Sequence, residues 1–176
     1  ACATSVRCLV QGAQELEAGS ARTYLAATAD RTSNGPHVFY PNPAAPGGTG
    51  ESENLVLDSF GHDPFAKNSM LQTAENVARE AGITRGEQEE VTLLRYKQYG
   101  SALADDHAFL KRYMLWPVEI KDARGKKVLA TEAGDQGIFP TTAEGLAGLR
   151  PVMEGGTVTF GTQTHPADGN AAMLLT

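Results

Sequence analysis

Cysteine is scarce in this 176-residue sequence, which contains only Cys2 and Cys8. Two cysteines form neither a disulfide framework nor a C-x-x-C motif. On one helix they would lie about 9 Å apart along the axis and on different faces, which is too far for a disulfide. The scarcity excludes a disulfide-stabilised secreted domain and a four-thiolate zinc site. We therefore expect two free thiols in a reducing compartment.

Long hydrophobic runs are also lacking. No apolar stretch approaches the length that a helix needs to cross a bilayer, and no charged-then-apolar leader is recognisable. We therefore expect a soluble, cytoplasmic protein with no membrane partner.

Positive charge is in deficit, because 15 Lys and Arg are set against 21 Asp and Glu, for a formal net charge of −6. A general nucleic-acid-binding protein needs a basic surface, so no nucleic-acid partner is expected. Histidines are few and scattered, and His37, His62 and His107 are too far apart in sequence to suggest a metal site. We expect no bound metal.

The chain is long enough, and at 41% hydrophobic residues apolar enough, for one sizeable core. The small and β-branched segment 22–29 predicts a buried strand directly after a helix. A helix that leads at once into a strand favours an α/β fold. The helix is predicted from apolar residues at helical spacing after Thr4, namely Val6, Leu9, Val10, Ala13 and Leu16.

Cys2 precedes or opens the first turn of that helix. There the backbone N–H groups and the positive end of the helix dipole favour a thiolate, which can attack the carbonyl carbon of a thioester. The residues alone leave a simpler alternative open, in which Cys2 is a small residue in a tight strand-to-helix turn.

The rest of the sequence predicts an irregular segment followed by helices and strands. Segment 30–68 is rich in Pro and Gly, which is typical of a lid or a binding loop. The charged residues of the long helix after Thr84 are expected to form a solvated surface with a few helical ion pairs. The predicted elements are a helix over 73–80, a capping box at 84–87 before a longer helix, a hairpin turning at 121–125, a capping box at 141–144 before a helix ending near 149–151, and strands over 157–160 and 171–175.

Several short motifs occur in a fixed order along nearly the whole chain. They are Cys2 with Thr4-Ser5-Val6-Arg7, Ser33-Asn34-Gly35-Pro36-His37, Thr73-Ala74-Glu75-Asn76-Val77-Ala78 with Ile83-Thr84-Arg85 and Glu87-Gln88, Thr141 to Leu149-Arg150-Pro151, Gly156-Thr157-Val158-Thr159, and Asp168-Gly169 with Ala171-Ala172. Each motif alone is weak. Their order and spacing resemble the thiolases, a family that makes or cleaves carbon–carbon bonds between acyl thioesters of coenzyme A.

The resemblance implies a layered αβαβα fold made of two similar halves, with an inserted irregular and helical lid. Residues 1–30 would end the N-terminal half and carry the nucleophile helix. Residues 31–125 would form the inserted lid, and residues 126–176 would return to the core and begin the C-terminal half. It also implies a homodimer or tetramer.

By the same resemblance, Cys2 is the nucleophile that takes the acyl group, and coenzyme A thioesters are substrates with no covalently bound cofactor. Thr164 stands where the family has a hydroxyl near the pantetheine arm. Met70 is the residue kept from the family's His-Met-Gly acyl pocket. His165 is interpreted as a loop or substrate-side histidine, although His165-Pro166 resembles the family's Gly-His-Pro.

The sequence also departs from the family pattern. Ala3-Thr4 follows Cys2 where a small Gly or Ser is usual. The family's activating histidine, its second cysteine and its Asn-Glu-Ala motif would lie beyond Thr176, so we expect the chain by itself to be inactive and to belong to a longer polypeptide. The alternative is a non-catalytic acyl-CoA-binding or scaffold subunit. A redox thiol protein is disfavoured, because no resolving cysteine lies near Cys2.

Overall fold

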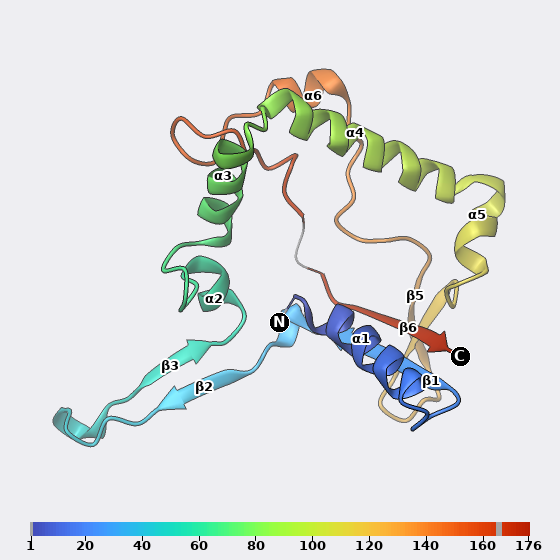
Figure 1. Ribbon diagram of the computed structural model, residues 1–176, viewed down its shortest axis with the longest axis horizontal. Coiled ribbons are helices and arrows are strands. Elements are labelled where there is room, and N and C mark those ends of the chain that lie inside the picture. Colours follow the sequence, from blue (N-terminus) through green and yellow to red (C-terminus); the bar gives the residue numbers. More distant parts are fainter. Residues whose placement is uncertain (1, 165–166) are drawn as a thin grey trace. The chain divides into compact units, whose positions relative to one another are not determined.

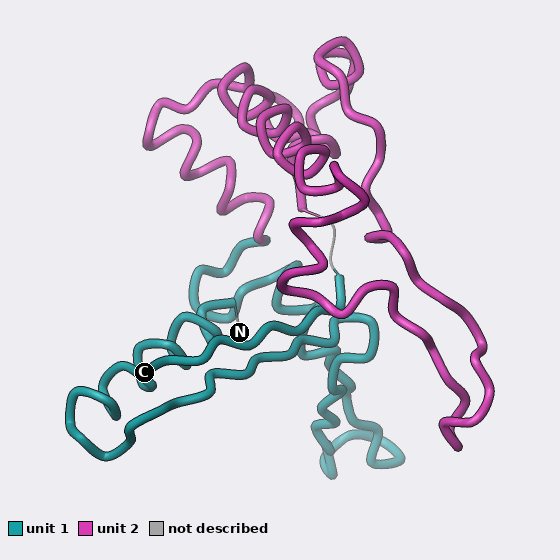
Figure 2. Tube along the Cα trace, turned by 90° about the vertical axis from the view of Figure 1, so that its right-hand side faces the viewer, with its two compact units in different colours: residues 1–69, 166–176 teal, residues 70–165 magenta. Residues whose placement is uncertain are grey.

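The structure is a computed structural model that describes residues 2–164 and 167–176. It divides into two compact units, the first made of residues 1–69 and 166–176 and the second of residues 70–165 (Figure 2). Helices and strands are mixed along the chain, as the α/β class predicts. The assignment of residues 31–125 as an inserted lid stays a prediction.

The core of the first unit is one helix packed on two strands. Helix α1 (Thr4–Glu17) leads into β1 (Tyr24–Asp30), which pairs with β6 (Gly169–Leu175), as Figure 1 shows. The pairing is antiparallel and runs from Tyr24 opposite Leu175 to Asp30 opposite Gly169. The two strands predicted from sequence thus form, and they are neighbours although 138 positions separate the end of one from the start of the other.

Burial in this unit is more limited than the sequence predicts. Ala26 of β1 is 3% exposed, but Val6 and Val10 of α1 are 62% and 42% exposed. The predicted apolar stripe is therefore only partly covered, through Leu9 and Leu16, which are half-buried.

The segment after β1 is more ordered than its Pro and Gly content predicts. It contains an antiparallel hairpin of β2 (His37–Tyr40) and β3 (Glu51–Asn54), followed by α2 (Leu57–Gly61). The alternation in His37-Val38-Phe39-Tyr40 is short and lies between prolines, so turn residues hid the strand signal. The prediction of a wholly irregular stretch is wrong.

The second unit is mainly helical, with α3 (Met70–Ala81), α4 (Arg85–Ala102), α5 (Ala104–Lys111) and α6 (Ala143–Ala147). The predicted capping box is confirmed, because Thr84 Oγ1 accepts from Glu87 N–H while the Glu87 carboxylate accepts from Thr84 N–H. Helix α5 was not predicted. Its backbone is left-handed at Asp105, Asp106 and His107, which no sequence pattern signals.

The hairpin predicted around residues 121–125 is confirmed as β4 (Val118–Lys121) paired with β5 (Val128–Glu132). At 141–144 the structure has a simple cap instead of a capping box. Thr142 caps α6 by accepting from Gly145 N–H, and glycine at that third position has no side chain to reach back.

The strand predicted over 157–160 is absent from the described structure, which has only an isolated bridge between Pro151 and Thr159. The N–H groups of Thr157 and Val158 bond to the Glu75 carboxylate, so they do not serve a strand ladder. A side chain from a distant helix thus overrides the local β propensity.

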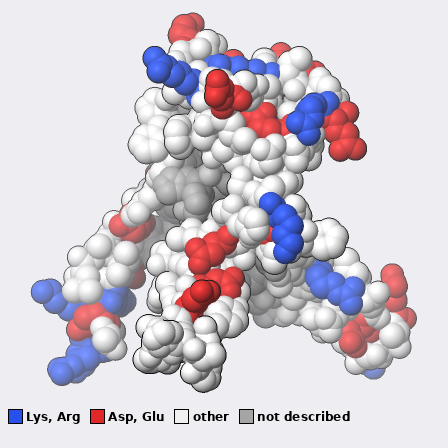
Figure 3. Space-filling view, turned by 90° about the vertical axis from the view of Figure 1, so that its left-hand side faces the viewer, with Lys and Arg blue, Asp and Glu red and all other residues white. Residues whose placement is uncertain are grey.

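Charged side chains of both signs are interspersed on the face drawn in Figure 3. Within the described residues, no helix is long and apolar enough to cross a membrane. In the same part of the chain, no group of three or more His, Cys, Asp or Glu side chains could hold a metal ion.

Candidate functional site

Cys2 lies in the turn directly before α1, and its side chain is exposed. Ala3 is the N-cap and offers no side-chain oxygen, and the first turn contains no acidic residue. No carboxylate in that turn therefore neutralises the positive end of the helix. The residues that follow Cys2 are helical, as the nucleophile hypothesis requires. Both cysteines are free, as predicted.

Gly12 sets how closely α1 approaches its strands. It is buried, and a Cβ placed on it would lie 2.5 Å from Tyr24 Cδ1 and 2.8 Å from Leu175 Cδ1. Only glycine permits this approach, because a methyl group has no room there. The first unit therefore holds the helix behind Cys2 by close apolar packing.

Asp168 joins the loop after β1 to the start of β6. Its carboxylate accepts from Ser33 N–H at 2.9 Å, from the Ser33 hydroxyl through a short bond, and from Thr32 Oγ1 at 3.4 Å. The Ser33 hydroxyl and N–H lower the pKa of Asp168 and outweigh the effect of burial. Ser33 and Asp168 belong to two separate sequence motifs, and their spacing gave no sign that they meet.

Glu75 plays the corresponding part in the second unit. Its Oε1 accepts from the N–H groups of Thr157 and Val158, both at 2.8 Å, and its Oε2 accepts from Thr157 Oγ1 at 2.9 Å. Burial by itself would raise the pKa of Glu75, but these three hydrogen bonds outweigh it and lower the pKa below its ordinary value. The half-buried carboxylate is thus held as an anion between α3 and the loop after α6.

Arg85 ties α4 to the end of α6. Its guanidinium donates to the carbonyls of Leu146 and Leu149, both at 2.9 Å, and to Glu89 Oε1 at 2.6 Å. A cation at the carboxyl end of a helix is favoured by the helix dipole. Glu89 was expected on a solvated surface with helical ion pairs. The i,i+4 ion pair forms, but the Glu89 side chain is only 18% exposed and is thus less solvated than expected.

Two of the predicted substrate residues, Met70 and Thr164, lie in the second unit, whereas Cys2 lies in the first. Met70 is the first residue of α3 and is 49% exposed. Thr164 is exposed at the end of the loop that Glu75 holds. His165 lies outside the described residues. The roles assigned to Cys2, Met70, Thr164 and His165 stay predictions.

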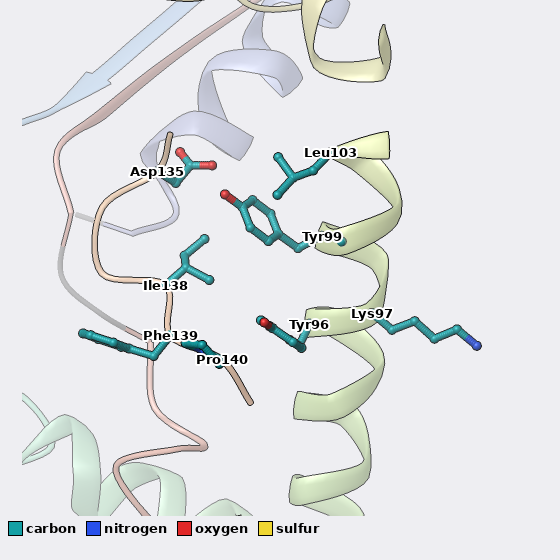
Figure 4. A pocket seen from close by; sticks show the side chains of 9 residues that line it. Tyr96, Lys97, Tyr99, Leu103, Asp135, Ile138, Phe139 and Pro140 are labelled. Atoms are coloured by element: carbon teal, nitrogen blue, oxygen red, sulfur yellow. The ribbon is translucent and has the colours of Figure 1, made fainter. Parts of the chain in front are cut away.

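A pocket of about 360 Å³ lies between the end of α4 and the segment 135–140. In Figure 4 the Tyr99 ring points toward Asp135, whereas Lys97 points away from the other side chains. Burial, and then Asp135, raises the pKa of Tyr99. With an acidic group inside and the ammonium outside, the pocket is unsuited to a phosphate. No predicted site residue lines it.

Comparisons of the sequence and of the structure with known proteins both find similarity to thiolases. The chain matches the family model of the thiolase N-terminal domain over residues 1–176. It is 31% identical to a β-ketoadipyl-CoA thiolase of Acinetobacter baylyi, over 99% of this chain and 44% of that protein. It is 28% identical to acetyl-CoA acetyltransferase IA of Candida tropicalis, over 99% of this chain and 43% of that one.

Among solved structures, human mitochondrial 3-ketoacyl-CoA thiolase is similar with a TM-score of 0.76 and 27% identity, over 98% of this chain and 43% of that one. The same human protein in complex with CoA gives a TM-score of 0.76 at 26% identity, over 98% and 42% of the two chains. The chain therefore spans less than half the length of the relatives it matches.

Proposed function

The chain belongs to the thiolase family, and we propose that it contributes the nucleophile, Cys2, to acyl transfer between thioesters of coenzyme A. One observation carries the proposal. Cys2 is exposed directly before a helix whose first turn has neither an acidic residue nor a capping side chain. That arrangement leaves the Cys2 thiol accessible to a thioester at the amino end of a helix.

The chemistry follows from a cysteine nucleophile. Cys2 Sγ attacks the carbonyl carbon of an acyl-CoA, the carbon–sulfur bond to coenzyme A breaks, and coenzyme A leaves as a thiolate that takes up a proton. The acyl group is then a thioester of Cys2. Either the α-carbon of a second thioester, once it has lost a proton, or the thiol of coenzyme A takes the acyl group and frees Cys2 for another cycle.

Met70 and Thr164 are proposed to contact the substrate, Met70 beside the acyl chain and Thr164 by a hydrogen bond to the pantetheine arm. Both are exposed, which leaves them accessible to a ligand. We assign His165 to the same side of the substrate. A homodimer or tetramer remains part of the proposal, and light scattering of the active protein tests it, since an active monomer would contradict it.

The function is tested by incubating the longer polypeptide, to which this chain is expected to belong, with acetyl-CoA and then measuring its intact mass. We expect one acetyl group, removed by neutral hydroxylamine as a thioester is. Cys2→Ala abolishes the adduct, whereas Cys8→Ala keeps it, because Cys8 is half-buried within α1.

Two results would contradict the proposal. An adduct that survives in Cys2→Ala assigns the acyl group to another residue. Tight acetyl-CoA binding with no adduct favours the alternative, a non-catalytic acyl-CoA-binding or scaffold subunit.

A further inference from the structure

We propose that Glu75 is a positioning residue: it fixes the path of segment 156–164 and thereby the place of Thr164 beside the substrate. This inference rests on the proposed function, because it takes Thr164 as a substrate contact. Glu75 itself reaches the segment from α3, at a sequence distance of more than 80 residues.

Both carboxylate oxygens of Glu75 are used. One accepts two consecutive backbone N–H groups and the other accepts a hydroxyl. A glutamine at this position would keep one oxygen but would turn an NH₂ group toward Thr157 Oγ1. That hydroxyl also accepts from Gln88 Nε2 at 2.8 Å, so it would then face two donors. The site therefore selects a carboxylate over an amide of the same shape.

The backbone beside Glu75 is shaped to let the carboxylate in. A Cβ on Gly156 would lie 2.5 Å from Glu75 Oε1 and 3.1 Å from the Met153 carbonyl oxygen. Gly156 also donates its N–H to that same carbonyl, which closes the turn before Thr157. Glycine is thus required where the segment meets Glu75, and the contact is specific.

The constraint passes from Thr157 toward Thr164 through two buried residues. Val158 is 6% exposed and Thr159 is fully buried, so the segment cannot slide at this point. The next residues fold back on Thr159, since Thr159 N–H donates to Thr162 Oγ1 at 3.0 Å and Gln163 Nε2 donates to the Thr159 carbonyl at 3.2 Å. Thr164 follows directly, so its position depends on how Thr157 and Val158 are held.

Hydrogen exchange provides the first readout. In Glu75→Gln we expect the N–H groups of Thr157 and Val158 to exchange about tenfold faster or more, the factor expected when a hydrogen bond to a charged acceptor is weakened. The matched control is Glu80→Gln, which makes the same change on the exposed face of the same helix and leaves the exchange unchanged.

Kinetics of the protein that forms the Cys2 adduct provide the second readout. We expect Glu75→Gln to raise KM for the acyl-CoA by about fivefold or more with kcat within about twofold, because binding is lost and the chemistry is kept. A merely structural role would lower the active fraction, and hence kcat, with KM unchanged.

Thr157→Val and Thr157→Ser keep the inference testable if Glu75→Gln folds poorly. Valine removes the hydroxyl that joins Glu75 to Gln88 and should raise KM, whereas serine retains it and should restore KM. An unchanged KM in Glu75→Gln and Thr157→Val, alongside faster exchange, would overturn the inference. A wild-type protein that neither binds acetyl-CoA nor forms the adduct would instead refute the proposed function.

Discussion

The two units use the same device, a carboxylate that joins distant segments, in different surroundings. In the first unit Asp168 bonds to exposed Ser33, and the helix beside it is held by apolar packing at Gly12. In the second unit Glu75 is half-buried, and that unit contains three of the four buried apolar side chains among the described residues, Ala78, Leu146 and Val158. We infer that the first unit depends chiefly on the close approach of helix and strands at Gly12. The second depends on a less exposed polar contact as well as on its buried apolar side chains.

The largest effect is expected from breaking the packing in the first unit. Gly12→Val places side-chain atoms where the Tyr24 ring and the Leu175 methyl group already lie, so α1 must move off its strands. We expect the free energy of unfolding to fall by about 3 kcal/mol, near the upper end for overpacked cores. Urea denaturation followed by circular dichroism measures it.

Ala13→Val is the matched control for this substitution. Ala13 is the next residue of α1 and is exposed, so the same valine meets no neighbour and costs only its lower helix propensity, about 0.5 kcal/mol. Equal losses in the two variants would show that close packing at Gly12 does not hold the helix.

Acid should weaken both units, and the second more steeply. The pKa values of Asp168 and Glu75 are lowered in the folded state from ordinary values of 3.8 and 4.5. The unfolded chain therefore binds more protons at acid pH, so the stabilisation is complete above the ordinary values and is lost as pH falls through the folded ones. Melting temperatures between pH 6 and pH 3 are the measurement, compared with Glu75→Gln and Asp168→Asn.

We expect Glu75→Gln to flatten this pH dependence more than Asp168→Asn, because Glu75 is the less exposed of the two. The reverse order would show that burial does not distinguish the two carboxylates. An unchanged slope in both variants would assign the acid sensitivity to other carboxyl groups with lowered pKa, such as Asp63 and Asp122.

Local signals in the sequence were enough for much of the fold. Periodicity predicted α1 and α3. Alternating apolar residues on either side of 121–125 predicted the β4–β5 hairpin, whose turn contains Gly125 at φ +67°. Where a distant side chain decides, local signals failed. Residues 157–160 have strand propensity, but Glu75 takes their N–H groups from more than 80 positions away.

In the candidate site, too, local features could be predicted from the sequence and distant contacts could not. Cys2 could be placed at a helix start because only its neighbours matter for that. The partners of Ser33 and Thr157 could not be predicted, since spacing along the chain says nothing about which loops meet. Both residues lie in the short motifs that carry the family resemblance, which indicated importance but not contact.

The capping box of α4 provides another test of whether polar contacts stabilise the second unit. Thr84→Ala removes the hydroxyl that accepts from Glu87 N–H, and we expect a loss of about 1 kcal/mol in the free energy of unfolding. Thr84→Ser should restore most of it. Thr142→Ala removes the simple cap of the shorter α6. If that variant lost unfolding free energy and Thr84→Ala did not, the expectation for the capping box would be wrong.

The smallest effect is expected at Thr159. Its hydroxyl oxygen is buried and has no hydrogen-bond partner among the described residues, whereas its N–H and carbonyl are both used. A buried hydroxyl without a partner costs free energy, so Thr159→Val, which keeps the shape and removes the polar atom, should leave stability unchanged or raise it by up to about 1 kcal/mol. Thermal unfolding measures the sign. A loss of more than about 1 kcal/mol would mean that this hydroxyl has a partner when the protein is in solution, and that the second unit depends on one more polar contact than the described residues show.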